Sequence, residues 1–256
     1  MAKENKLSPL ILFLIATVLL TAGWLMKSFP ILIFAGFAPL FALTDQIKKE
    51  SVFWESFEWI LIALCASFFA AHFYSLLLLP TVLIQGIAFT LPFIAYKFAK
   101  QSLGDRLGKL TILFFWLGTE YLFLKLHWPA NSLFLGDALS LHMDWQRWNS
   151  HTGYLGASLW ILLVNLILYY SYFKTGKMNW PLFILFLITL TGPIVFSYLS
   201  PEVVISRETM ISFYDNNEIP FLARYEQRGE FIPRTAAWIS ALILLFAFVK
   251  NKTKKK

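Results

Sequence analysis

One glutamate and a nearby histidine are the residues in this sequence whose types and spacing best suit chemistry. Glu120 stands inside the apolar and aromatic run "FFWLGTEYLF" (114–123), with no Lys or Arg within four positions on either side. Trp116, Glu120, Phe123 and His127 are spaced i, i+4, i+7 and i+11, which places them on one face of a helix. A carboxyl group and an imidazole within hydrogen-bond reach can form a general acid–base pair.

The other candidate ligands and nucleophiles are sparse. His142 and His151 follow His127, but the spacing of the three histidines matches no compact zinc motif. The one cysteine, Cys65, lies in "LIALCASFF", where no charged neighbour would lower the pKa of its thiol, so we interpret it as a packing residue. The sequence therefore predicts no metal, no cofactor and no disulfide.

The elements that position these residues belong to a membrane protein by composition. Of the 256 residues, 58% are hydrophobic and only 14% are charged, and the mean hydropathy is +0.62. Soluble domains contain about a quarter charged residues. The net charge of +7 does not indicate a nucleic-acid partner, because the basic residues are distributed between apolar runs.

Eight apolar runs are candidate membrane spans. They cover residues 7–26, 28–43, 57–79, 81–98, 110–126, 155–173, 180–198 and 232–249. Eight crossings with the N-terminus inside put 15 of the 22 Lys and Arg on the cytoplasmic side, whereas a second run that did not cross would leave 8 there. We therefore predict an all-α integral membrane protein with eight transmembrane helices and both termini cytoplasmic. Cleavage of the first run as a signal peptide is the alternative for the N-terminus.

This topology places Glu120 within the membrane, near the outer end of the fifth span. An ionisable group at that depth is expected to face the protein interior or a wet cavity. Three roles are open for it: a structural hydrogen bond between helices, contact with a substrate or lipid headgroup, and proton relay. After Pro129, the segment "ALSLHMDWQRW" (138–148) is rich enough in Leu, Met and Trp to lie in the membrane interface.

A short extracytoplasmic segment, 199–231, connects the last two spans. Its "DNN" (215–217) lies between partly alternating runs and predicts a hairpin, with Pro220 at an edge. A segment of this size is too small to fold independently. We expect it to rest on the membrane part, so that residues 1–256 form a single polytopic domain.

Four stretches together resemble one known family. They are "SFPILIFAGFAPLFAL" (28–43), "FFWLGTEYLF" with its Trp-x-x-x-Glu spacing, "DWQRWNSHTGYLGASLWILLVN" (144–165) and "ARYEQRGEFIPRTAAW" (223–238). They are similar to stretches of apolipoprotein N-acyltransferases, bacterial inner-membrane enzymes that add the third acyl chain to lipoproteins. The resemblance implies a multi-pass protein of the bacterial cytoplasmic membrane, with phospholipid and diacylated lipoproteins as partners.

The catalytic part of that family has no counterpart here. The family carries a nitrilase-like domain with a Glu-Lys-Cys triad between its seventh and eighth helices, and the segment 199–231 at that position has no Cys and no Lys. No catalytic residue is therefore assigned. Seven residues are candidates for facing lipid or substrate: Trp116, Glu120, His127, Trp145, Gln146, His151 and Asn165.

Three functions follow from the resemblance and the missing triad. The first is a membrane protein that binds phospholipid or lipoprotein without the family's catalysis. The second is a subunit of a split N-acyltransferase whose separate partner supplies the nitrilase-like domain. The third is an acyltransferase that uses His and Glu residues of the membrane part. A transporter has little support, because the spans show no internal repeat.

Overall fold

The computed structural model describes residues 7–26, 28–46, 51–126, 129, 131–199 and 220–253, and over these ranges it is helical, with no β-strand. The longer helices are α1 (Pro9–Leu25), α2 (Ile33–Gln46), α3 (Ser51–Ala71), α4 (Leu79–Leu126), α6 (Gly156–Leu168), α7 (Trp180–Leu199) and α9 (Pro220–Thr253). Short helical elements connect them: η1 (Pro30–Leu32), η2 (Leu76–Leu78), η3 (Leu135–Leu139), η4 (Met143–Gln146), α5 (Asn149–Thr152) and the π-helical η5 (Tyr169–Phe173).

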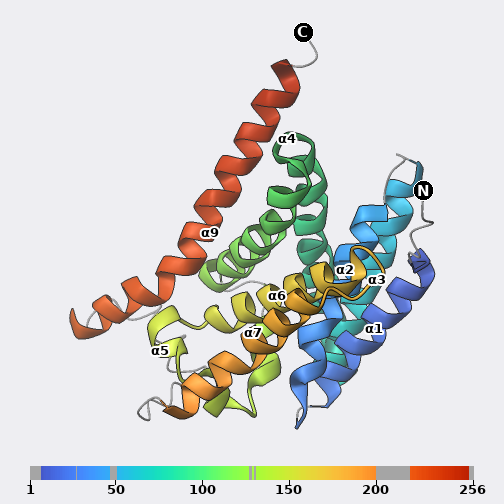
Figure 1. Ribbon diagram of the computed structural model, residues 1–256. Helices are drawn as coiled ribbons and strands as arrows, with labels where there is room; N and C mark the ends of the chain where they lie inside the picture. The colour runs from blue at the N-terminus through green and yellow to red at the C-terminus, as the bar shows by residue number, and fades with distance from the viewer. Residues whose placement is uncertain are drawn as a thin grey trace.

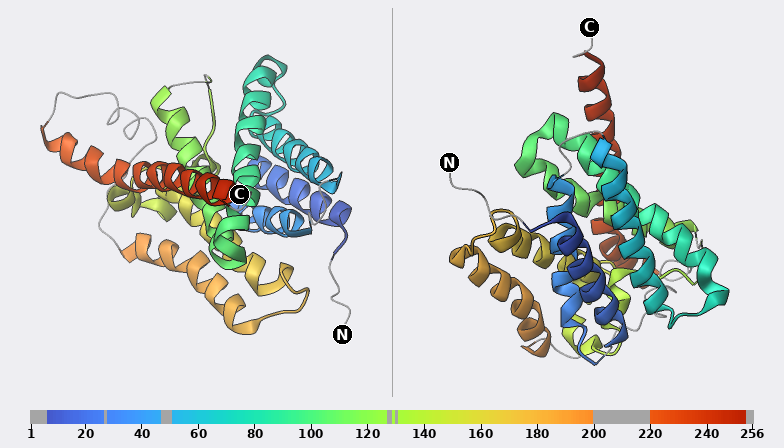
Figure 2. Two further views of the ribbon diagram at one scale, coloured as in Figure 1. Left: turned by 90° about the horizontal axis from the view of Figure 1, so that it is seen from above. Right: turned by 90° about the vertical axis from the view of Figure 1, so that its right-hand side faces the viewer.

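The long helices pack in an order different from their order in the chain. Neighbouring pairs place α7 beside α6, α6 beside α2, α2 beside α1, α1 beside α3, α3 beside α4 and α4 beside α9. In the right-hand view of Figure 2, α7 and α3 accordingly lie on opposite flanks of α1 and α2. Helix α9 runs along the second half of α4 (Figure 1). The order brings α2 and α6, far apart in sequence, into direct contact.

Helix α4 is two helices joined at Gly104. This residue has φ 80° and ψ 176°, a conformation open essentially only to glycine. The break lies between the predicted spans 81–98 and 110–126, so the two spans correspond to separate arms of α4 (Figure 1). The second arm carries Trp116 and Glu120.

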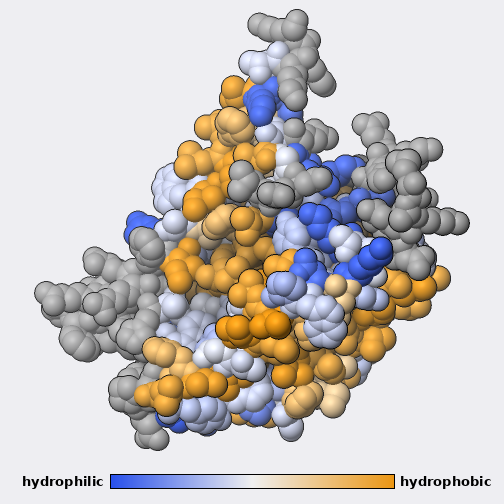
Figure 3. All heavy atoms as spheres, viewed as in Figure 1, coloured by the Kyte–Doolittle hydropathy of each residue, from blue (hydrophilic) through white to orange (hydrophobic). Residues whose placement is uncertain are grey.

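Within the part of the chain that the structure describes, four helices are long and apolar enough to cross a membrane, which indicates a membrane protein. They are Leu76–Lys100, Gly156–Phe173, Trp180–Leu199 and Ile232–Asn251. The predicted first, second and third spans fall on shorter apolar helices, Pro9–Leu25, Pro30–Gln46 and Ser56–Ala71. Much of the apolar surface of α7 and α9 is exposed (Figure 3), as a helix facing lipid requires.

The segment that precedes α6 folds into the protein to a greater extent than its sequence predicted. All five residues of η3 are buried, as are Gln146 of η4 and Asn149 of α5. Leu141 remains largely exposed, so only part of the predicted interfacial stretch 138–148 is free to meet lipid. Ala138, Leu139 and Gln146 of this stretch are buried, whereas Ser140 and Asp144 are exposed like Leu141.

The predicted hairpin within 199–231 is wrong in its second half. Residues 200–219, which include the "DNN", lie outside the described residues. From Pro220 the chain is helical and continues as α9 to Thr253. Proline is favoured at the first position of a helix because its missing N–H has no intrahelical partner there. Pro220 therefore begins a helix and does not mark the edge of a strand.

Candidate functional site

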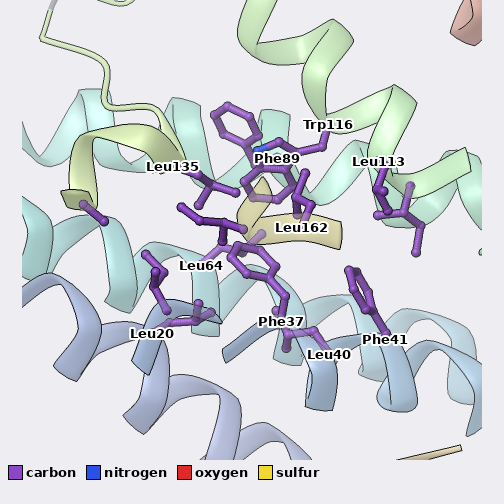
Figure 4. Close-up of a cluster of buried hydrophobic side chains, with 14 of the residues drawn as sticks. Leu20, Phe37, Leu40, Phe41, Leu64, Phe89, Leu113, Trp116, Leu135 and Leu162 are labelled. Atoms are coloured by element: carbon purple, nitrogen blue, oxygen red, sulfur yellow. The ribbon is translucent and has the colours of Figure 1, made fainter. Parts of the chain in front are cut away.

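Trp116 lies at the centre of the hydrophobic core. It is fully buried, and its ring centroid is 4.4 Å from that of Phe89, 5.0 Å from that of Phe37 and 6.3 Å from that of Phe93. Figure 4 shows Trp116 and Phe89 from α4 above Phe37 from α2. The indole is thus part of the packing that joins α2 to both arms of α4.

Glu120 is fully buried one turn after Trp116. Its Oε1 accepts two hydrogen bonds, from Trp116 Nε1 at 3.0 Å and from the backbone N–H of Leu135 at 2.9 Å. Its Oε2 is also buried and has no hydrogen-bond partner. Ser158 of α6 lies beside the same carboxyl group, and its Oγ accepts from Gly136 N–H at 3.1 Å. Glu120 therefore holds η3 against α4 through only one of its two oxygens.

A second buried acid, Asp137, stands in η3. Its carboxyl group accepts from the backbone N–H of Phe134 at 2.8 Å and from the hydroxyl of Tyr154. It is close enough to Glu120 for the two carboxyl groups to interact electrostatically. We call Trp116, Glu120, Asp137, Tyr154 and Ser158 the Glu120 cluster.

Asn165 of α6 uses its whole side-chain amide on neighbouring backbone. Its Oδ1 accepts from Phe37 N–H at 2.8 Å and Ala38 N–H at 3.1 Å, and its Nδ2 donates to Ile33 O and Ile161 O, both at 2.9 Å. These bonds tie α6 to α2 within the turn before Pro39. Of the roles open to a polar residue here, the structure gives Asn165 an interhelical hydrogen bond.

Gln146 and Trp145 organise the outer segment locally. The Gln146 amide donates to Leu139 O at 3.0 Å and accepts from Asn149 Nδ2 at 3.0 Å. The Trp145 ring stacks on His142, with centroids 4.3 Å apart, and His142 Nε2 lies 3.1 Å from Ser28 O. Both side chains are engaged by protein.

Two of the candidate histidines and the cysteine complete the set. His127 lies outside the described residues; His151 lies in α5, but its side chain is not described. The predicted pairing of Glu120 with an imidazole thus remains a prediction. Cys65 packs where α3 meets Gly86 of α4, so closely that its Sγ would clash with a Cβ at Gly86. That close approach agrees with Cys65 as a packing residue.

A second polar cluster, which the sequence did not predict, lies at the other end of α4's second arm. The Lys109 side chain is almost fully buried. Its Nζ donates to Phe41 O at 2.7 Å, to Thr44 Oγ1 at 3.0 Å and to Asp45 Oδ1 at 2.8 Å. The ammonium group thus has an acceptor for each of its three protons.

Two tyrosines and a second lysine converge on the same aspartate. Tyr96 donates its hydroxyl to Asp45 Oδ1 at 2.8 Å, and Lys100 Nζ lies 3.4 Å from the same oxygen. Tyr169 donates its hydroxyl to Asp45 Oδ2. Lys109 also lies 4.4 Å from the ring centroid of Tyr96 and 4.7 Å from that of Tyr169, within cation–π range. We call Asp45, Tyr96, Lys100, Lys109 and Tyr169 the Asp45 cluster.

The electrostatics of the Asp45 cluster favour the ionised carboxylate. Burial of Asp45 opposes ionisation, but the charge of Lys109 and the hydrogen bonds from Lys109, Tyr169 and Tyr96 outweigh it. The pKa of Asp45 therefore lies below its usual value of 3.8. This arrangement is an interhelical ion pair, and its groups satisfy one another.

The sequence contained one signal for this cluster. Lys109 stands one residue before a predicted span and Asp45 two residues after another, with both ends assigned to the same side of the membrane. Opposite charges at matched depth predict an ion pair between these two residues. The hydrogen bond between Asp137 and Tyr154 had no such signal, because both residues lie in an irregular segment whose contacts do not follow a helical or strand period.

Metal binding has no support in the part of the chain that the structure describes. It contains no group of three or more His, Cys, Asp or Glu side chains placed to hold an ion. Comparisons of the whole chain with protein-family models, with curated proteins and with solved structures found no match.

Proposed function

We propose that this chain is an eight-span protein of the bacterial cytoplasmic membrane, related to the membrane part of apolipoprotein N-acyltransferases. It binds phospholipid or diacylated lipoprotein without the family's Glu-Lys-Cys catalysis. The proposal takes its ligand class from the resemblance of the four stretches. Its support comes from how those stretches meet.

The four resembling stretches form one connected framework. Asn165 in 144–165 bonds Phe37 in 28–43, and the ring of Phe37 packs on Trp116 in 114–123. Glu120 and Ser158 connect the second and third stretches. Gly118 lies against Ala237 of the fourth stretch, with 3.3 Å between the Ala237 Cα and the position of a Cβ at Gly118. Residues that carry the resemblance thus contact one another across the fold, as a shared scaffold requires.

The absence of thiol chemistry rests on the sequence and on Cys65. The chain has no other cysteine, and Cys65 packs in the middle of α3 against Gly86. A thiol that attacks an acyl ester needs access and an activating base. Cys65 has no acidic or basic neighbour in sequence to activate it.

The positions of the two clusters support the proposed alternation of the third to sixth spans. Asp45, Tyr96, Lys109 and Tyr169 fall near the predicted cytoplasmic ends of four spans, and they meet. Glu120 and the segment 131–155 fall near the predicted outer ends, and they also meet. Loss of a crossing among the third to sixth predicted spans would place members of one cluster on opposite sides of the membrane.

The test is a combined binding and acyl-transfer experiment. Protein in nanodiscs is mixed with phospholipid and a diacylated lipopeptide; retention of the lipopeptide and its mass are followed. The same peptide without acyl chains is the binding control. We expect the lipopeptide to be retained through its acyl chains and its mass to be unchanged.

Each other outcome overturns the proposal in a distinct way. Equal retention of the peptide without acyl chains, or no retention, removes lipoprotein binding. A gain of one acyl chain makes the protein an enzyme; loss of that gain in Cys65→Ala would identify the thiol, and loss after joint replacement of His127, His142 and His151 would identify the histidines. A soluble nitrilase-like protein that co-purifies from native membranes would establish a split enzyme.

A further inference from the structure

The Glu120 carboxyl group has an unusual distribution of partners. Both hydrogen bonds, from Trp116 and Leu135, fall on Oε1. Oε2 is buried without a partner. An ionised carboxylate spreads its charge over both oxygens and commonly accepts several hydrogen bonds. The one-sided arrangement is what a neutral acid shows, with the carbonyl oxygen accepting and the hydroxyl on the other side.

The described residues place no cation beside this acid. Among the described residues, no Lys or Arg is recorded in contact with Glu120. Lys125, the nearest base in sequence, is exposed, and its Nζ lies 6.0 Å from the ring centroid of Tyr121. A buried charge without a partner is strongly unfavourable.

The groups that face Glu120 from the packed elements are neutral hydrogen-bond donors and a second acid, and none of them is a cation. Its own helix supplies Trp116, α6 supplies Ser158, and η3 supplies the second acid, Asp137. The hydroxyl of Tyr154 is donated to Asp137 and not to Glu120. A second carboxyl group at this distance makes a charge on Glu120 less favourable still.

We propose that Glu120 is a buried proton-binding site, with its carboxyl group held as the neutral acid on Oε2 while η3 is docked on α4. The proton comes from solvent, and no other bond changes. Asp137, which accepts from Phe134 N–H and Tyr154 O–H, is the ionised member of the pair. The site does not depend on lipid binding, so it can be tested apart from the proposed function.

Infrared spectroscopy of the protein in nanodiscs at pH 7 tests the proposal directly. A glutamate in water, with a pKa of about 4.3, is ionised at this pH. We expect a C=O stretching band of a protonated carboxylic acid that Glu120→Gln removes and Asp137→Asn leaves. No such band in the wild-type protein would overturn the proposal. A band that survives Glu120→Gln and is lost in Asp137→Asn would also overturn it, by placing the proton on Asp137.

Isotope labelling keeps the test valid if a variant fails to fold. Glutamate labelled with ¹³C at its side-chain carboxyl should shift the band to lower wavenumber, whereas aspartate labelled in the same way should not. Glu120 and Asp137 are the acidic side chains that the described region buries completely or nearly so. A band that shifts only with labelled aspartate would overturn the assignment without any substitution.

Discussion

The two polar clusters place a carboxyl group in opposite situations. Asp45 receives Lys109, Lys100 and two tyrosine hydroxyls while 29% of its side chain remains exposed. Glu120 is fully buried and receives two N–H groups on a single oxygen. The first carboxylate is compensated by positive charge, whereas the second has no cationic partner among the residues that the structure describes. A carboxyl group in or next to an apolar helix can therefore be an ion-pair member or a neutral acid, depending on the groups that surround it.

Removal of Lys109 from the Asp45 cluster should have the largest effect on stability among the substitutions that leave both acids in place. Lys109→Met should destabilise the protein by about 3 kcal/mol, because Asp45 loses its closest counter-charge while partly buried. Unfolding in mixed micelles measures the loss. Lys125→Met, at an exposed position on the same helix arm, is the matched control and should change little. Equal effects of the two substitutions would show that Lys109 is not a special contact.

Asn165 is a buried, uncharged side chain whose amide is fully hydrogen-bonded, so it can be compared with the two acids. Asn165→Leu should cost about 1–3 kcal/mol, because α2 backbone groups at Ile33, Phe37 and Ala38 lose their side-chain partner. The same unfolding assay measures the change. Ser171→Ala is the control, since the Ser171 hydroxyl donates to Leu168 O within its own turn. A loss as small as that of Ser171→Ala would mean that α6 and α2 are held by packing alone.

Substitution of Gly153 strains the backbone next to the Glu120 cluster and leaves both acids unchanged. Gly153 has φ 80° and directly precedes Tyr154, which bonds Asp137. Gly153→Ala should cost about 1–2 kcal/mol because the added Cβ disfavours this left-handed region. Gly192→Ala on α7, where nothing lies within 4 Å of an added Cβ, should be neutral or slightly stabilising. A neutral Gly153→Ala would contradict a rigid turn at this position.

The contribution of the Asp45 ion pair to stability should decrease as the pH falls. The folded pKa of Asp45 lies below its usual value of 3.8, so its ionised form stabilises the protein above that pH. This contribution should be lost as the pH falls through the lowered folded value. The stability difference between wild type and Asp45→Asn should therefore be constant from pH 7 to 5 and narrow below about 4. A gap that widened on acidification would reverse the sign of the argument.

The helices were predictable from the sequence because their signal is local. The apolar runs 81–98 and 110–126 predicted the two arms of α4, and the isolated Glu120 indicated an interior position. The contacts of Glu120 with Leu135 and Ser158 were not predictable, because the irregular segment between α4 and α6 determines how η3 and α6 meet α4. Pro220 misled for a related reason: proline is compatible with both a strand edge and the first turn of a helix.

Replacement of each acid by its amide tests the contrast between the clusters most directly. Asp45→Asn and Glu120→Gln preserve shape and remove only the capacity for charge. We expect Asp45→Asn to lower the free energy of unfolding by about 3–5 kcal/mol, because Lys109 is left buried without its counter-charge. Glu120→Gln should lower it by about 1 kcal/mol or less. Comparable losses, or a larger loss for Glu120→Gln, would contradict the assignment of one carboxyl group as an ion-pair member and the other as a neutral acid.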